Sequence, residues 1–283
     1  MNEPVTTIYC LCEDFFKAMR RFDDPQVRLT TAEVMTVPLV AATFFGANID
    51  RTCRFLYEYG YMPNMISKGR FNHRLHKIDP ELWQGLFSLL AEFFKRRNSE
   101  VEEERAYYAV DSFPVVVACD NIRIGRWRLY PVEKHGGAFR GYISSKRSYF
   151  YALGVHMVVT GAGEPVEFSI VAGSEADVRV FKDLELDLPE GSIICAEKAY
   201  TDYHYEDLLK EAGGLELKAH RKKNSKRPMP AWEEFVSKSI RKYIERVFSG
   251  ISRLFPKKIH AVTPRGFELK IVWFVLAFAI QCL

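Results

Sequence analysis

The sequence predicts an α/β protein in which a helical N-terminal part precedes a mixed sheet flanked by helices. Residues 1–100 show apolar positions at helical spacing, whereas from about residue 104 the chain changes to short apolar runs typical of strands. Three strands come first, and helices then alternate with strands. This order favours an α/β layer architecture.

The N-terminal part is expected to contain several short helices. Thr30 and Glu33 have the spacing of a capping box, which predicts a helix that begins after Thr30 and ends near Gly46. Further helices are expected over 48–59 and 67–78. A longer amphipathic helix should follow from Pro80, since proline suits the first turn of a helix.

The segment 67–78 has a basic face opposite an apolar one. Its basic residues follow the spacing i, i+3, i+4, i+7: Arg70, His73, Arg74 and Lys77. A short basic helix after two other helices resembles the recognition element of a helix-turn-helix. We therefore expect DNA contact from this face, with an ordinary solvated surface helix as the alternative.

The second part follows a regular order along the chain. Strands are expected over 106–117, 148–160, 164–173, 191–197 and 215–220, and helices over 175–186, 202–213 and 233–255. The last segment, "IVWFVLAFAI", is strongly apolar but shorter than the ~20 residues that a membrane-spanning helix needs. It predicts a buried core helix, and we expect no association with a membrane.

Three acids occupy positions that are otherwise apolar. Asp111 lies inside the first strand, Glu197 ends the apolar strand "SIICA", and Glu245 flanks the buried stripe of the 233–255 helix. Burying a carboxylate without a partner is costly. Converging acids of this kind can hold two divalent cations about 3.5–4 Å apart for phosphoryl transfer. The alternative is local pairing of Glu197 with Lys198 and of Glu245 with Arg241.

Basic residues gather beside these acids. A loop between the second and third acid is expected to contact DNA phosphates, with a solvated loop as the alternative; its residues are Arg221, Lys222, Lys223, Lys226 and Arg227. Trp127, next to Arg126, suits stacking on an unpaired base, although a core tryptophan fits equally well. The net charge of +4 and the pI near 8.6 agree with nucleic acid as a partner.

The cysteines indicate a reducing compartment. The chain has 6 cysteines without CxxC or zinc-finger spacing, which favours buried free thiols. The first residues, "MNEPVTTIYC", lack the pattern of a signal peptide. We therefore expect a cytoplasmic protein.

The ordered blocks of the chain resemble a known family. These are "VDSFPV", "YISSKRSYFYALGVHMVVT", "GEPVEFSIVAGSEADVRVF", "LPEGSIICAEKAYTDY", "RKKNSKR" and "IERVFSGISRLFPKKIHAVTPRGFELK". They resemble bacterial insertion-sequence transposases with an Asp-Asp-Glu triad, and most closely the insertion-sequence nine-eighty-two family. The resemblance implies an RNase H-like catalytic domain over 101–283 and a helix-turn-helix-like DNA-binding domain over 1–100.

The same resemblance implies the activity and its partners. A DNA transposase of this kind cleaves and joins DNA strands at insertion-sequence ends with two Mg²⁺ or Mn²⁺ ions. Its partners are the terminal inverted repeats and the target DNA, on which a homodimer is expected. The location would be the bacterial cytoplasm, in association with the nucleoid.

The triad is carried over residue by residue. Asp111 matches the first aspartate, Glu245 the closing glutamate, and Arg241 the arginine of the Arg-x3-Glu arrangement. The family's second acid is the Asp of Asp-Lys-Ala-Tyr, whereas this chain has Glu197. Glutamate moves the charge outward by one methylene group, which would weaken catalysis. The alternatives to an active transposase are a catalytically impaired, transposase-derived DNA-binding protein and an RNase H-like nuclease.

Overall fold

The computed structural model describes residues 2–101, 105–118, 129–135, 137–143, 148–221, 225–228, 230–256 and 259–283. The chain divides into two compact units. Unit 1 comprises Met1–Leu90, Leu254–Ala261 and Arg265–Leu283, and unit 2 comprises Ala91–Arg253 and Val262–Pro264.

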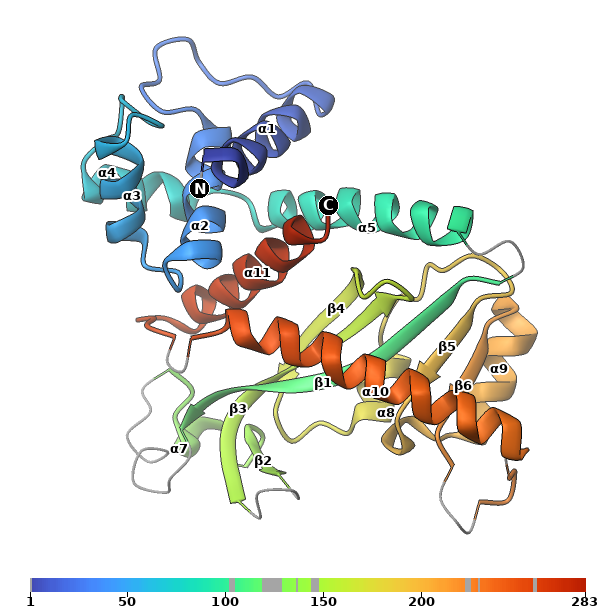
Figure 1. Ribbon diagram of the computed structural model, residues 1–283. Coiled ribbons are helices and arrows are strands. Elements are labelled where there is room, and N and C mark those ends of the chain that lie inside the picture. Colours follow the sequence, from blue (N-terminus) through green and yellow to red (C-terminus); the bar gives the residue numbers. More distant parts are fainter. Residues whose placement is uncertain are drawn as a thin grey trace. The chain divides into compact units, whose positions relative to one another are not determined.

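The described elements of unit 1 are helices (Figure 1). They are α1 (Asn2–Ala18), α2 (Thr31–Phe44), α3 (Ile49–Glu58), α4 (Lys68–Lys77), the beginning of α5 (Pro80–Val101) and α11 (Pro264–Gln281). The capping box is confirmed at α2. The Thr30 hydroxyl accepts a hydrogen bond from the Glu33 N–H at 3.1 Å, and a Glu33 carboxylate oxygen accepts one from the Thr30 N–H at 2.5 Å.

The core of unit 1 depends on α11 as well as on the N-terminal helices. The rings of Trp83 on α5 and Trp273 on α11 lie 5.9 Å apart, and those of Phe255 and Phe274 lie 4.8 Å apart. As expected, α11 is a buried core helix. However, it belongs to unit 1 and not to the sheet domain predicted over 101–283. A helix that is apolar all round must be surrounded by other elements, and here the N-terminal helices surround it.

Two further expectations for unit 1 have clear outcomes. On α4, Phe71 and Leu75 are buried while Arg70 and Lys77 are exposed, so its amphipathic pattern is confirmed; its role as a recognition helix stays a prediction. Cys12 is buried as expected, but the nearby Cys10 is exposed.

A search for membrane spans gives a limited result. No single helix in the described part of the chain is long and apolar enough to cross a membrane. The pair α2 and α3 meets the length and composition criteria together, with a bend of 107° between the two helices.

Unit 2 is built around a mixed sheet. Its described elements are β1 (Tyr107–Ala118), α7 (Val132–His135), β2 (Arg140–Ile143), β3 (Ser148–Thr160), β4 (Pro165–Ala172), α8 (Asp177–Lys182), β5 (Ile193–Ala196), η2 (Lys198–Tyr200), α9 (Tyr203–Gly213), β6 (Glu216–Ala219) and α10 (Ala231–Leu254). The strand order is β2-β3-β1-β5-β6, and β4 also pairs with β3 (Figure 1). Pairing is antiparallel among β1 to β4 and parallel from β1 through β5 to β6.

The register of β1 and β5 decides where two of the acids lie. The parallel ladder runs from Tyr107 opposite Ile193 to Val110 opposite Ala196. Asp111 and Glu197 are the next residue on each strand. The two strands are therefore neighbours, and both acids lie at the same end of the ladder.

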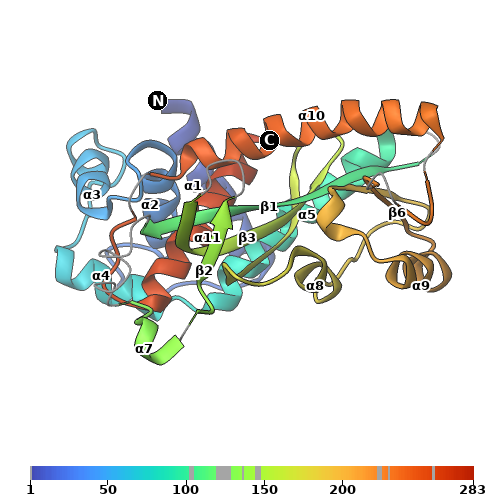
Figure 2. The ribbon, with the colours of Figure 1, turned by 90° about the horizontal axis from the view of Figure 1, so that it is seen from below.

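Helices cover both faces of the sheet. Figure 2 shows α10 along one face and α8 and α9 on the other. The alternation of side chains along β1 agrees with this arrangement. The ring of Phe113 lies 6.2 Å from that of Phe248 on α10, whereas the neighbouring Ser112 bonds to Asp177 on α8.

The turn between β3 and β4 lies directly against α10. Gly163 has a φ of +89°, a backbone conformation that favours glycine, and a Cβ atom added there would lie 2.8 Å from a methyl group of Val247. Close packing at this turn therefore fixes the distance of α10 from the sheet.

We predict that Gly163→Ala destabilises the protein more than Gly191→Ala does. Gly191 also has a positive φ, +81°, but open space around its Cα. Its replacement should lower the free energy of unfolding by about 1 kcal/mol through backbone strain alone. The Gly163 variant adds overpacking and should lose roughly 2–4 kcal/mol. Urea unfolding measures both values, and equal losses would show that the contact with α10 is unimportant.

Candidate functional site

Asp111 is the centre of the candidate site. One of its carboxylate oxygens accepts a hydrogen bond from the Ser112 N–H at 2.8 Å. The pKa of Asp111 is raised to about 7, mainly by burial and also by the negative charges of Glu197, Asp177 and Glu245, while the hydrogen bond from Ser112 opposes the increase. Four acids therefore share one electrostatic environment.

Each of these acids comes from a different element. Glu197 directly follows β5, Asp177 is the first residue of α8, and Glu245 lies on α10. On α10, Glu245 is exposed beside the buried Ile244 and lies one turn before Phe248, the residue that packs on β1. Glu197 and Glu245 thus lie within electrostatic range of Asp111, and so does Asp177.

Asp177 is held by a small polar network on the α8 side of β1. The Ser112 hydroxyl donates to an oxygen of Asp177 at 2.8 Å, and Nδ1 of His156 lies 3.7 Å from the same oxygen. His156 stands opposite Ser112 in the β1–β3 ladder and is only 3% exposed. Burial lowers the pKa of His156, and the charge of Asp177 partly offsets this effect. The network fixes the position of a carboxylate that acts electrostatically on Asp111 from the α8 side of β1.

Tyr200 belongs to the site, although the sequence analysis did not single it out. Its side chain is 1% exposed, and its hydroxyl has no hydrogen-bond partner among the described residues. Burial and the charges of Asp177, Asp111 and Glu197 raise its pKa well above the ordinary value. Its position three residues after Glu197 could have indicated this, because residues i and i+3 of a 3₁₀ turn lie on the same side.

The donor set suits a hard cation in its chemistry. Carboxylates are the ligands that Mg²⁺ prefers, and a cation relieves repulsion between like charges. Yet no three His, Cys, Asp or Glu side chains in the described part of the chain are grouped as metal ligands. The acids interact electrostatically, while their positions do not form a complete coordination shell.

The predicted basic loop contains two arginines that are already paired. Arg221 makes two hydrogen bonds of 2.6 and 2.7 Å to Glu206, and Arg227 makes two of 2.7 and 2.8 Å to Asp207. Both guanidinium groups also lie over the ring of Tyr203, at 5.3 and 5.0 Å from its centroid. These contacts anchor the loop to α9.

The other predicted DNA-binding residues have varied positions. Lys226 is exposed in the same loop, and Arg70, His73 and Lys77 are exposed on α4. Arg74 on α4 is partly buried and forms an ion pair with Asp23 at 3.6 Å. Several expectations fall outside the described residues: Arg126, Trp127, Lys222 and Lys223, as well as the side chain of Arg241.

Comparison with known proteins identifies a family. A family model described as "Transposase DDE domain" matches residues 102–259, more than half of the chain and including Asp111, Glu197 and Glu245. Among solved structures, the Mos1 transposase paired-end complex with left transposon end is similar at 11% identity and a TM-score of 0.25, over 92% of this chain and 85% of that chain. No curated protein matches.

We predict that the cation-free protein loses stability between about pH 4 and pH 7 because of Asp111. Its pKa is about 7 in the folded state and 3.8 ordinarily, so the folded protein retains a proton in this range that the unfolded chain has released. The contribution is complete below the lower value and is lost as the pH rises through the upper one. It amounts to at most roughly 4 kcal/mol.

The measurement is urea unfolding in EDTA across this pH range. Asp111→Asn should lack the loss, so its advantage over the parent protein should grow with pH. Glu211→Gln, which alters an exposed carboxylate on α9, is the control and should follow the parent. Parallel curves for the parent and Asp111→Asn would contradict the assignment.

Proposed function

Because this chain belongs to the family that contains the transposase DDE domain, we propose that it cleaves and joins DNA strands at insertion-sequence ends by two-metal-ion phosphoryl transfer. The observation that carries the proposal is that Glu197, Glu245 and Asp177, from three different elements, all act electrostatically on the buried Asp111. The sheet would then be an RNase H-like core. The order of sequence motifs further supports assignment to the insertion-sequence nine-eighty-two-like group.

The acids provide the binding groups for two Mg²⁺ or Mn²⁺ ions. Asp111, at the centre, would contact both ions, with Glu197 serving one and Glu245 the other. Bound ions of this kind activate an attacking oxygen and stabilise the departing one. Asp177 is held in position by the hydrogen bond from Ser112. It would add negative charge from the α8 side of β1 and not bind an ion directly.

Burial and the neighbouring charges favour the protonated form of Asp111 as long as no cation is bound. Asp111 resists ionisation when the acids are alone, and a divalent cation reverses this preference by attracting all of the carboxylates. Tyr200 is buried, and the charges of three of these acids affect its hydroxyl. It would be a hydrogen-bond donor next to a bound cation.

DNA is the proposed partner, as terminal inverted repeats and as target. Exposed Lys226 and the exposed basic residues of α4 suit phosphate contacts. Arg221 and Arg227 act differently, because they order the loop on α9 through their carboxylate pairs. A homodimer on DNA in a bacterial cytoplasm completes the proposal, since two transposon ends must be brought together.

Glu197 favours a second candidate, a catalytically impaired protein that binds DNA. Its carboxylate is displaced by one methylene group relative to aspartate, and displacement of ~1 Å can cost about 100-fold in rate. An RNase H-like nuclease is the remaining alternative. Strand nicking without joining would identify the nuclease, and binding without nicking would identify the impaired protein.

We predict that Asp111→Asn and Glu245→Gln abolish nicking of a labelled terminal-repeat duplex, whereas Glu211→Gln retains it. The two carboxamides keep the shape of the side chains but remove the charge that holds a cation. The products are separated on denaturing gels after incubation with Mg²⁺ or Mn²⁺. Undiminished nicking by Glu245→Gln would exclude that residue from the site.

We also predict that Glu197→Asp increases the nicking rate in Mg²⁺ more than in Mn²⁺. Mg²⁺ demands near-ideal octahedral geometry and therefore penalises the longer side chain more strongly. Initial rates for the parent and the variant with each ion test this expectation. A slower variant with both ions would show that glutamate is the better residue in this chain.

Cation binding has a readout that does not require activity. Mg²⁺ or Mn²⁺ should raise the midpoint of thermal unfolding of the parent protein, and more at pH 8 than at pH 5, because the acids must be ionised. Asp111→Asn should show a smaller increase. An increase that is equal in both proteins would place the bound cation elsewhere.

A further inference from the structure

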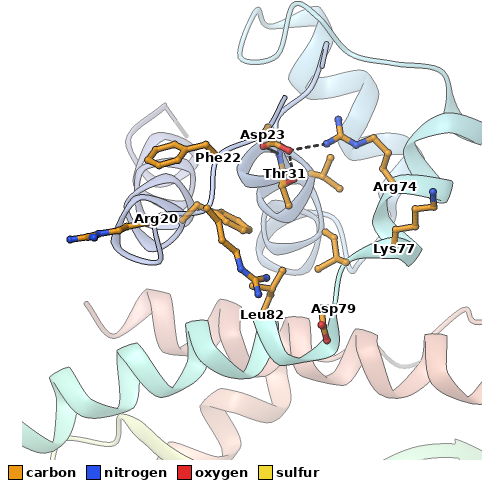
Figure 3. Close-up of a pocket in the computed structure, with 12 residues that line it drawn as sticks. Arg20, Phe22, Asp23, Thr31, Arg74, Lys77, Asp79 and Leu82 are labelled. Atoms are coloured by element: carbon orange, nitrogen blue, oxygen red, sulfur yellow. Dashed lines mark hydrogen bonds and ion pairs between the residues drawn. The ribbon is translucent and has the colours of Figure 1, made fainter. Parts of the chain in front are cut away.

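Unit 1 contains a pocket that lies outside the acidic site. It has a volume of about 590 Å³ and lies between the α1–α2 connection, α4 and the start of α5 (Figure 3). We call it the Arg74 pocket. Its polar and aromatic lining includes Arg20, Arg21, Phe22, Asp23, Arg74 and Lys77.

The Arg74 pocket has an excess of positive charge. Four basic side chains line it, against the two acids Asp23 and Asp79. Both acids are used by the fold. Asp23 accepts hydrogen bonds from the N–H and the hydroxyl of Thr31, each at 2.6 Å, and Asp79 accepts one from the Glu81 N–H at 3.1 Å. These bonds satisfy the acids at the beginnings of α2 and α5, where helices favour negative charge.

Arg74 is held in place as a cation. It donates to the carbonyl oxygen of Leu29 and lies 3.6 Å from an oxygen of Asp23, and its side chain is 27% exposed. A guanidinium group has five N–H donors, so donors remain for a ligand. Lys77 is one turn further along α4 and is exposed. This helix therefore presents one fixed cation and one adaptable cation to the pocket.

The opposite side of the Arg74 pocket combines charge with an exposed ring. Arg20 and Arg21 are among its lining residues, and Figure 3 shows Phe22 across from Arg74 and Lys77, with the guanidinium group of Arg20 pointing away from them. The chain turns sharply after α1, with a φ of +52° at Arg20, and this turn leaves Phe22 81% exposed. Exposing a phenylalanine so fully gives up the stabilisation of its burial, which suits a ring that stacks on a ligand.

We propose that the Arg74 pocket binds one nucleotide unit of a DNA strand. Its phosphate would lie between the arginines and Lys77, and its base would stack on Phe22. The volume lies within the range of small-ligand sites and is far too small for a duplex. Aromatic stacking beside basic groups is how proteins bind single strands without reading their sequence.

This inference rests on the proposed function only for the choice of DNA as the partner. It differs from the basic face predicted for α4, since Arg70 and His73 do not line the pocket, whereas Arg20, Arg21 and Phe22 do. Binding is measured in EDTA. A failure of this inference is therefore distinguishable from a failure of the cleavage assays, which need a divalent cation.

The experiment measures binding of a fluorescein-labelled 12-nucleotide single strand to the full-length protein by fluorescence anisotropy. Lys77→Ala, Arg21→Ala and Phe22→Ala should each weaken binding by about 10-fold. The two basic substitutions should also reduce the salt dependence, by about 0.7 in the slope of log K against log salt. Phe22→Ala should leave this slope unchanged.

Matched controls come from unit 1 itself. Arg54→Ala removes an exposed cation of α3, and Tyr59→Ala removes an aromatic side chain that is 71% exposed. Neither residue lines the pocket, so both variants should bind within twofold of the parent protein. Equal weakening by Arg54→Ala and Lys77→Ala would overturn the proposal in favour of a diffuse basic surface.

Competition identifies the ligand more closely. The nucleotide dAMP should displace the labelled strand at millimolar concentration, and inorganic phosphate at the same concentration should not, because it lacks a base. If dAMP binds the protein but never displaces the strand, the pocket is a site for free nucleotides and the assignment to DNA is wrong. All variants alter exposed residues, and circular dichroism confirms that each one is folded.

Discussion

The burial of the Asp111 carboxylate is the constraint on which the arrangement of unit 2 depends. A charge at this position, in a strand with neighbours on both sides, has lost much of its water. The largest electrostatic effects on it come from three further acids. An arrangement that opposes its own ionisation in this way is unfavourable for folding alone. Perturbed acids of this type are typical of functional sites.

Much of this arrangement could be predicted from the sequence, because the relevant patterns are local. Alternation of apolar residues located β1, and the apolar run before Glu197 located the end of β5. Helical spacing placed Glu245 at the margin of a buried stripe on α10. Joining the three positions required only that β1 and β5 be neighbours, and a parallel sheet with helical connections makes this a natural pairing.

What the sequence could not provide depends on contacts between distant segments. The pattern of α11 shows that it is buried but not which helices bury it, so it was assigned to the wrong unit. Arg221 and Arg227 looked like free phosphate ligands because Glu206 and Asp207 lie on a separate helix. The hydrogen bond between Ser112 and Asp177 joins residues 65 positions apart, so no local spacing reveals it. These features were missed because they depend on contacts between segments that are far apart in the sequence, and local sequence patterns do not encode such contacts.

The unfavourable burial of Asp111 lowers the stability of the fold and, in the proposed chemistry, favours the binding of a cation. In the absence of a cation, the fold holds Asp111 against its preference for water and against the charges of Glu197 and Glu245. Close packing resists any relaxation of this strain, since Phe248 rests on Phe113 and Val247 on the β3–β4 turn. A cation that enters the cluster is therefore attracted by carboxylates that the fold already holds in position. Preorganised charge of this kind acts without rearrangement at the moment of reaction, which is why a destabilising cluster is an effective catalytic device.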